Sequence, residues 1–412
     1  MTIYGILILM MVMTTMMTVI IYWGRDGKTA NIIFLGFLIR ILATIAGYFH
    51  ILPLLGHGAD SDAGMFDAIA MYNVNHGGFY FQQTNYTDVL TIIYFLTDGS
   101  RIFAQFLNVL LATGTLILTS NILYKLDVPR KTINNMLKVL VFMPVLICFS
   151  GALLRESWIE FFIALSIYYF VGWFINGSTS MMILYVLAVF AASYMHAGSI
   201  FILAGFFLAF TSYKPSTKKI KLSGSTIVAG VFISLIVIIF LANIDSLGGK
   251  FSNMDEEGVE GAMVNGYGAN RGNSAYLTWL NVDNPIIGFL FSPLKMFYFL
   301  FSPIPFDWRG ITDIIAFTMD SSVYAYLCWK IYKYRKNRNG KINIALRKYL
   351  IICILALTFV FAFGTKNSGT AMRHRAKFTT LIVITYAISM SYKNNTNKKV
   401  LYRRIQKQNL NS

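Results

Sequence analysis

Long apolar stretches, repeated along almost the whole chain and separated by short polar segments, constrain its fold more than any other feature. A helix of about 20 mostly apolar residues can cross a lipid bilayer, and about 17 are sufficient. Inside hydrocarbon, where no water can satisfy the backbone, only helices and closed barrels can span. With 56% hydrophobic residues among 412 and a mean hydropathy of +0.59, the chain is far more apolar than a soluble domain. We expect a single all-α, multi-pass membrane domain over residues 1–412.

The apolar pattern predicts about 11 transmembrane helices. They are expected at residues 2–23, 31–51, 101–124, 138–154, 157–175, 181–195, 198–213, 224–243, 311–332, 348–364 and 377–392. The sixth and seventh are short for two spans, and the segment 193–198 between them predicts a tight turn near the outer surface. The first span has no Lys or Arg before it and no small-residue cleavage site, so we expect a retained span and not a cleaved signal peptide.

Lys and Arg gather in a few segments that set the orientation of the chain. These are residues 125–138, 214–221, 330–348 and the tail 393–412. Because basic loops stay in the cytoplasm, we place the loop 333–347 and the tail there, with the N-terminus outside. The acidic loops 52–100 and 244–310 then lie on the outer, periplasmic face. The net charge of +17 is explained as a topology signal, and we expect no nucleic-acid partner.

The segment 285–308 is apolar enough to span, but counting it as a span would put the basic segment 330–348 outside. Three prolines interrupt it, at positions 293, 303 and 305, and Lys295 would lie deep in lipid. We therefore expect a re-entrant or interfacial segment that returns to the outer face, which is possible where irregular backbone lines a protein cavity.

Four cations lie between two apolar helices on the outer side, against the positive-inside rule: Lys366, Arg373, Arg375 and Lys377. A bound polyanion at the outer face would explain them. Because the guanidinium fork matches phosphate oxygens, we predict a pyrophosphate site formed by Arg155, Arg373, Arg375 and Lys366. The alternative is that these cations extend to lipid headgroups or pair with acidic residues of the outer loops.

Other polar residues near the predicted outer ends of the spans are candidates for proton transfer and for substrate binding. The catalytic candidates are His196, Glu156, Asp60 and Asp62, and the substrate-binding candidates are Arg271, Arg309, His374, Asp67 and Trp308. Structural explanations compete with these roles. His196 next to a glycine is suited to a hydrogen-bonded turn, and Glu156 is favoured at a helix N-terminus by the helix dipole. Arg155 would also serve as an interfacial anchor.

Three further patterns bear on buried charge, metal binding and disulfides. Arg40 and Asp320 lie within predicted spans, where an unpaired charge is costly, so we predict a buried Arg40–Asp320 ion pair. The Asp60-Ser-Asp62 sequence has the form of a metal-binding Asp-x-Asp motif, but two carboxylates alone do not select a divalent ion. The three cysteines have neither a CxxC spacing nor a His partner. We expect no metal and no disulfide.

In hydropathy, length and loop plan, the chain resembles the Wzy-type polymerases of bacterial O-antigen and capsular polysaccharide. In residues, the resemblance is carried by four segments: 60–67, Leu153 to Glu156, the proline-broken 301–306, and Gly369 to Arg375. It implies a GT-C-like glycosyltransferase of the bacterial inner membrane. Such an enzyme transfers a glycan chain from undecaprenyl pyrophosphate to the non-reducing end of a lipid-linked repeat unit. It needs no metal or other cofactor, and a chain-length regulator protein is a possible partner.

What the resemblance implies for the site is a division between cations and a base. Arg155, Arg373 and Arg375 would stabilise charge on the leaving pyrophosphate. His196, Glu156 or an Asp of the first outer loop would take the proton of the acceptor hydroxyl. The alternatives are an O-antigen ligase, a transferase that uses a polyprenyl-phosphate sugar, a lipid-linked oligosaccharide flippase and a structural scaffold.

Overall fold

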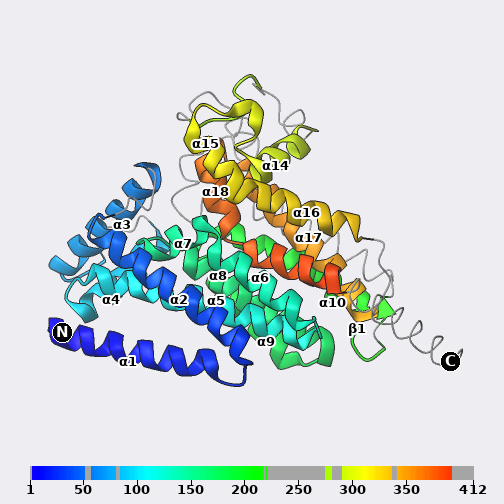
Figure 1. The fold of residues 1–412 in the computed structure, drawn as a ribbon, viewed down its shortest axis with the longest axis horizontal. Coiled ribbons are helices and arrows are strands. Elements are labelled where there is room, and N and C mark those ends of the chain that lie inside the picture. The colour runs from blue at the N-terminus through cyan, green and yellow to red at the C-terminus, as the bar shows by residue number, and fades with distance from the viewer. Residues whose placement is uncertain are drawn as a thin grey trace, which may run out of the picture.

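The computed structural model describes residues 2–51, 57–79, 84–217, 219–220, 274–280, 290–335 and 341–391. The first half contains α1 (Ile3–Tyr22), α2 (Gly27–Tyr48), α3 (His57–Asn75), α4 (Asn85–Thr97), α5 (Arg101–Lys125), α6 (Arg130–Phe142), α7 (Pro144–Gly151), α8 (Glu156–Asn176), α9 (Thr179–Met195), the 3-10 helix η1 (Ala197–Ile202) and α10 (Leu203–Ser212). The second half contains α14 (Ser292–Phe301), η3 (Pro305–Asp307), α15 (Ile311–Ala316), the π-helical turn η4 (Phe317–Ser321), α16 (Ser322–Lys333), α17 (Lys341–Phe363), α18 (Ser368–Ala376) and a last helix, Thr379–Ser391. Two short strands, β1 (Tyr213–Lys214) and β2 (Lys219–Ile220), pair antiparallel. The expected all-α architecture is confirmed for the described residues (Figure 1).

Five described helices are long and apolar enough to cross a membrane: α1, α2, α5, α8 and α17. The bent pair α6–α7 makes a sixth if it is one span. Three shorter apolar helices are Thr179–Met195, Ala197–Ser212 and Thr379–Ser391. The expected span 311–332 is helical in three pieces and is not among the long apolar helices, and the expected span 224–243 lies outside the described residues. The described helices therefore support a membrane protein. They do not confirm the expected number of eleven spans.

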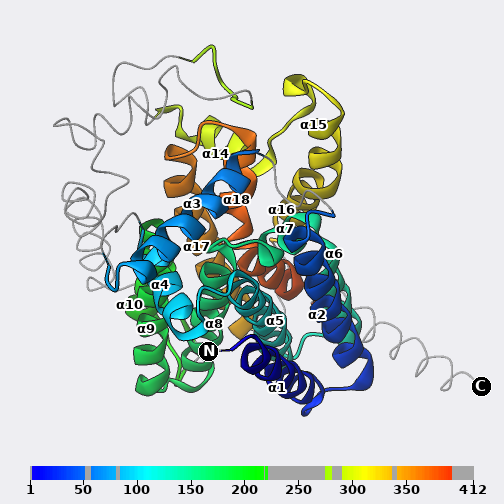
Figure 2. The same cartoon turned by 90° about the vertical axis from the view of Figure 1, so that its left-hand side faces the viewer.

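The described helices have two chemically different ends. At one end lie the α1–α2, α5–α6 and α8–α9 turns and the β1–β2 hairpin, with Arg25, Lys125, Arg130 and Lys214 near them. At the other end lie the start of α8 and the ends of α2, α9 and α17, together with α3, α4, α14 and α18 (Figure 1). Figure 2 looks onto this second end, where α3 lies in front of α18. The first end is therefore the one that the positive-inside rule would place in the cytoplasm.

The break between α6 and α7 provides a hydrogen-bond acceptor for Arg40, which is buried inside α2. Pro144 has no N–H, so the carbonyl of Leu140 loses its usual helical partner, and the two helices meet at a bend of 56°. Arg40 Nη2 donates to that carbonyl at 3.0 Å, and Nη1 donates to the Gly36 carbonyl at 3.1 Å. The predicted Arg40–Asp320 pair is wrong, because Asp320 pairs with Arg375.

The segment expected to re-enter the membrane contains α14, a helix of ten residues that is about 15 Å long and too short to span. It packs against α17 and α18. Lys295 would have lain deep in lipid if this segment were a span. It is buried in the protein and donates from Nζ to the Phe363 carbonyl at 3.2 Å. It thereby satisfies a carbonyl at the C-terminal end of α17, where cations are favoured.

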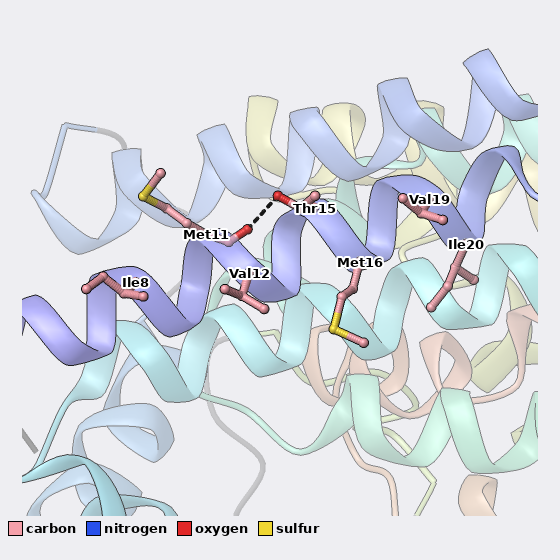
Figure 3. A pocket seen from close by; sticks show the side chains of 7 residues that line it. All are labelled: Ile8, Met11, Val12, Thr15, Met16, Val19 and Ile20. Atoms are coloured by element: carbon pink, nitrogen blue, oxygen red, sulfur yellow. Dashed lines mark hydrogen bonds between the residues drawn. The ribbon is translucent and has the colours of Figure 1, made fainter.

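α1 lies at the periphery of the described helices (Figure 1). In its most apolar 18-residue stretch, only 6% of the residues are buried. A groove of about 570 Å³ runs along it, lined by Ile8, Met11, Val12, Thr15, Met16, Val19 and Ile20 (Figure 3). The hydroxyl of Thr15 donates back to the Met11 carbonyl at 2.9 Å, so the groove presents almost no unsatisfied polar group. Such a surface is suited to lipid chains.

Candidate active site

Residues from separate parts of the chain meet at the end of the helices opposite the basic turns. We name this group the polar cluster: Asp62, Arg155, Glu156, His196, Arg373, His374 and Lys377. Asp62 comes from α3 and Glu156 begins α8, while His196 directly follows α9. Arg373 and His374 lie in the last turn of α18. Most residues of the cluster therefore lie at or next to helix ends, outside the middle of the long apolar helices.

Arg373 is the centre of the polar cluster. Its Nε donates to Glu156 Oε1 at 2.5 Å, and its Nη1 donates to Asp62 Oδ2. The side chain is only 13% exposed, and its Nη2 is buried without a hydrogen-bond partner among the described residues. Burial alone lowers the pKa of Arg373, but the carboxylates of Glu156 and Asp62 outweigh it and raise the pKa above its ordinary value. Arg373 is thus a fixed cation with one donor still available.

Glu156 is the acid buried most deeply in the cluster, with its side chain 3% exposed. As the first residue of α8 it lies where the helix dipole favours a negative charge. Lys377 Nζ lies 4.0 Å from its Oε1, which also accepts from Arg373. Its Oε2 is buried and has no partner within the described ranges. The cluster therefore holds an acceptor, as well as a donor, that its own residues do not satisfy.

Arg155 connects the start of α8 to the end of α9. Its Nη1 donates to the carbonyl of Met195 at 3.2 Å, and its Nε is buried without a partner in the described part of the chain. Burial lowers the pKa of Arg155, whereas Glu156 beside it acts in the opposite direction. Since arginine keeps its proton at any physiological pH, Arg155 adds a second buried positive charge next to Arg373.

Two histidines and a phenylalanine form the aromatic side of the polar cluster. The ring centroids of His196 and His374 are 5.2 Å apart, and the two rings meet edge to face. Phe361, near the end of α17, lies 5.2 Å from the ring of His196 and 5.1 Å from that of His374. Lys377 Nζ lies 3.0 Å from His374 Nδ1. Imidazole and carboxylate groups that can exchange protons are thus placed beside fixed cations.

Arg375, expected in the pyrophosphate site, is placed elsewhere. Its guanidinium is fully buried and pairs with Asp320, with Nε 2.8 Å from Oδ2. Its Nη1 donates to the carbonyls of Phe299 and Leu300, both at 3.1 Å, and its Nη2 donates to Ser321 Oγ. The contacts of Arg375 join α14, η4 and α18, so this arginine serves the packing of three helices and is withdrawn from the polar cluster.

Three further expected site residues have contacts outside the polar cluster. Asp67 pairs with Arg101 at 3.2 Å, and Arg309 pairs with Asp313 at 3.3 Å. The ring of Trp308 meets that of Phe317 edge to face at 5.5 Å.

Three more expected residues are placed only through their backbone or not at all. The Lys366 carbonyl accepts from the backbone of Tyr276 at 3.3 Å. Asp60 lies in α3, two residues before Asp62, but its side chain is outside the described part of the structure. Arg271 lies outside it altogether. In the part that is described, no three His, Cys, Asp or Glu residues are grouped as metal ligands.

Sequence reasoning named Lys377 among the four outer cations but left it out of the predicted site, and it did not single out Phe361. A signal existed for Lys377, because it lies four residues after Arg373 and such pairs share a helix face. No sequence signal marks Phe361, which is one phenylalanine among 34.

No family model, curated protein or solved structure matches this chain. The function must therefore be argued from the chemistry of the polar cluster and from its place in the membrane.

Proposed function

We propose that the protein is a glycosyltransferase that acts at the outer face of the bacterial inner membrane. It takes a glycan chain from undecaprenyl pyrophosphate and joins it to the non-reducing end of another lipid-linked repeat unit, as a polysaccharide polymerase does. The observation that carries the proposal is Arg373, a buried cation whose Nη2, like atoms of the neighbouring Arg155 and Glu156, has no hydrogen-bond partner among the residues that the structure describes.

The cations of the polar cluster support binding of the donor's pyrophosphate. Arg373 Nη2 and Arg155 Nε are buried donors without partners among the described residues, and such donors are costly unless a ligand satisfies them. Lys377 adds a third positive charge near Glu156. Three cations against the two carboxylates of Asp62 and Glu156 leave the cluster positive, which favours an anion that carries more than one charge.

The same groups supply what the transfer needs. An oxygen of the acceptor hydroxyl bonds to the anomeric carbon, and the bond from that carbon to the pyrophosphate oxygen breaks. The electron pair leaves with the pyrophosphate, where Arg373 and Arg155 stabilise the charge that develops. The hydroxyl proton passes to a base, for which His196, Glu156, Asp62 and Asp60 are the candidates. Because the pyrophosphate is a good leaving group, the reaction requires no nucleotide.

Asp62 has a particular place in this scheme. Its side chain is 29% exposed, whereas that of Glu156 is 3% exposed, although both contact Arg373. A phosphate oxygen that enters from the outer side therefore meets the Asp62 contact first. Exchange of Asp62 for phosphate at Arg373 would release a carboxylate next to the acceptor hydroxyl.

The proposal is tested by replacing Arg373 in a strain that lacks the chromosomal gene and reading the glycan ladder at matched protein levels. We expect Arg373→Ala to abolish chains longer than one repeat. Arg373→Lys keeps the charge but loses the planar fork, so it should give a shortened ladder. The matched control is Arg130→Ala, which removes an exposed arginine at the start of α6, at the opposite end of the helices. Exposed substitutions away from a site change stability by about 0.5 kcal/mol or less, so this variant should keep the full ladder.

The form of the glycan product separates the proposal from its alternatives. A single repeat on the final acceptor, with no longer chains, supports a polymerase. A bare acceptor points to a ligase or a flippase and contradicts the proposal. A wild-type ladder from Arg373→Ala would remove the pyrophosphate role altogether.

A further inference from the structure

The contact between Lys377 and His374 fixes where the imidazole carries its proton. Lys377 Nζ lies 3.0 Å from His374 Nδ1, and the two residues are one helical turn apart. An ammonium group has three donors and no acceptor. The Nδ1 atom must therefore accept, and in a neutral imidazole the proton is then on Nε2.

Lys377 lies between an acidic and an aromatic side chain. Lys377 is buried, but Glu156 Oε1 lies 4.0 Å away, and the face of Phe361 lies 5.4 Å from its Nζ. A carboxylate and an aromatic face both favour the ammonium form. The ring of His374 lies 5.2 Å from that of His196 and 5.1 Å from that of Phe361, and Lys377 is its polar neighbour at Nδ1.

We propose that Lys377 is a positioning residue that holds the neutral imidazole of His374 in the tautomer protonated at Nε2. The consequence for catalysis rests on the proposed glycosyltransferase function. The Nδ1 lone pair of His374 is then used by Lys377, and the N–H that His374 can donate is on Nε2. His374 therefore does not take the proton of the acceptor hydroxyl, and the base is one of the remaining candidates, of which His196 is the neighbouring imidazole.

The same chain contains a histidine that should show the opposite tautomer. His76 Nδ1 lies 2.9 Å from the carbonyl oxygen of Tyr72. A carbonyl can only accept, so His76 carries a proton on Nδ1. His76 follows α3 and is exposed, and it provides an internal reference for the measurement on His374.

The tautomers are read by nitrogen-15 NMR of the full-length protein, labelled on histidine and reconstituted in lipid nanodiscs. The pH is set well above the histidine pKa of about 6.5, so that neutral forms dominate. Signals are assigned by their loss in His374→Gln and His76→Gln. We expect an unprotonated Nδ1 and a protonated Nε2 at His374, and a protonated Nδ1 at His76.

Two replacements of Lys377 test its part. Lys377→Arg keeps a donor without an acceptor and should preserve the His374 tautomer. Lys377→Met removes the donor and should allow a mixture of tautomers. A protonated Nδ1 at His374 in the wild-type protein would overturn the proposal, as would an unchanged His374 signal in folded Lys377→Met. If Lys377→Met does not fold, the wild-type and Lys377→Arg spectra still decide the tautomer.

A second experiment tests the donor role through the glycan ladder. The amide of Gln at position 374 places an N–H close to the position of Nε2, whereas the shorter Asn places it near that of Nδ1. We expect His374→Gln to polymerise within about tenfold of wild type, a change no larger than one hydrogen bond explains. His374→Asn should lose the ladder, and equal loss in both variants would contradict the donor role. The NMR result stands independently of whether Arg373→Ala abolishes polymerisation, so failure of the function and failure of this inference can be told apart.

Discussion

At the scale of single residues, Arg373 and Arg375 differ more than their closeness in sequence suggests. They lie in α18, whose N-cap Asn367 accepts from the Thr370 amide at 2.8 Å. Two residues advance about 200° around a helix, so the two guanidinium groups lie on opposite faces. Arg373 therefore contacts Asp62 and Glu156, whereas Arg375 contacts Asp320. An expectation that assumed a loop here could not distinguish the two arginines.

The buried pair of Arg375 and Asp320 predicts that loss of either charge unfolds the protein. Arg375→Met or Asp320→Asn leaves a buried charge without its partner, which costs about 3–5 kcal/mol. The double variant Arg375→Met with Asp320→Leu should recover part of this loss, because no charge remains to be solvated. Thermal unfolding in detergent measures the effect. A variant of Arg375 that unfolds like wild type yet loses the glycan ladder would show instead that Arg375 acts on the substrate.

At the scale of elements, hydropathy alone predicted α1, α2, α5 and α8 to within a few residues, because lipid requires one long apolar helix for each crossing. It did not predict α3, α4 or α18, which lie in segments expected as outer loops. Their residues are too polar for a span, and their ends depend on caps and on packing against other helices. The polar cluster was predicted only in part for the same reason, since Asp62 was expected in a loop and lies in α3, whereas the start of α8 at Glu156 was expected within one residue.

Close packing of α10 on α17 depends on Gly205, which predicts a large effect of adding one methyl group. A Cβ at this position would overlap Cys353 Sγ and lie 2.5 Å from the backbone oxygen of Tyr349. Gly205→Ala should destabilise the protein by about 1–3 kcal/mol, the usual cost of overpacking. The matched control is Gly27→Ala at the start of α2, where a Cβ meets nothing within 4 Å. Unfolding temperatures of the two variants test this.

Adding Cys353→Ala to Gly205→Ala separates the two contacts. It removes the sulfur but leaves the Tyr349 carbonyl in place, so we expect rescue that is only partial. Full rescue would show that the helix backbones can move apart freely, and an unfolding temperature of Gly205→Ala equal to that of wild type would contradict the close approach itself.

At the scale of the whole molecule, the described helices separate basic turns at one end from the polar cluster at the other (Figure 1). Local sequence gives this arrangement correctly because charge and hydropathy are both local properties. The four cations that break the pattern are accounted for differently by the structure. Arg375 lies in a buried ion pair, while Arg373 and Lys377 lie in the polar cluster and Lys366 lies in the turn before α18.

This polarity predicts the membrane side of two exposed residues. In a protein whose native cysteines are replaced by alanine, Asp98→Cys after α4 should react with a membrane-impermeant maleimide in intact spheroplasts. Lys131→Cys in the first turn of α6 should react only after the membrane is permeabilised. Both side chains are exposed, so accessibility within the protein is matched. The reverse pattern would place the polar cluster in the cytoplasm and exclude an outer-face reaction.

The bond from Arg40 to Leu140 joins residues that are 100 positions apart, and the ribosome makes Arg40 first. While the chain is being synthesised, α2 must enter the bilayer before the carbonyl exposed by Pro144 exists. An arginine at the centre of a helix costs about 2.5–3.5 kcal/mol during insertion, and for that interval only the apolar residues of α2 offset it. The environment of Arg40 is therefore completed only when α6 and α7 have been made, about 100 residues after Arg40.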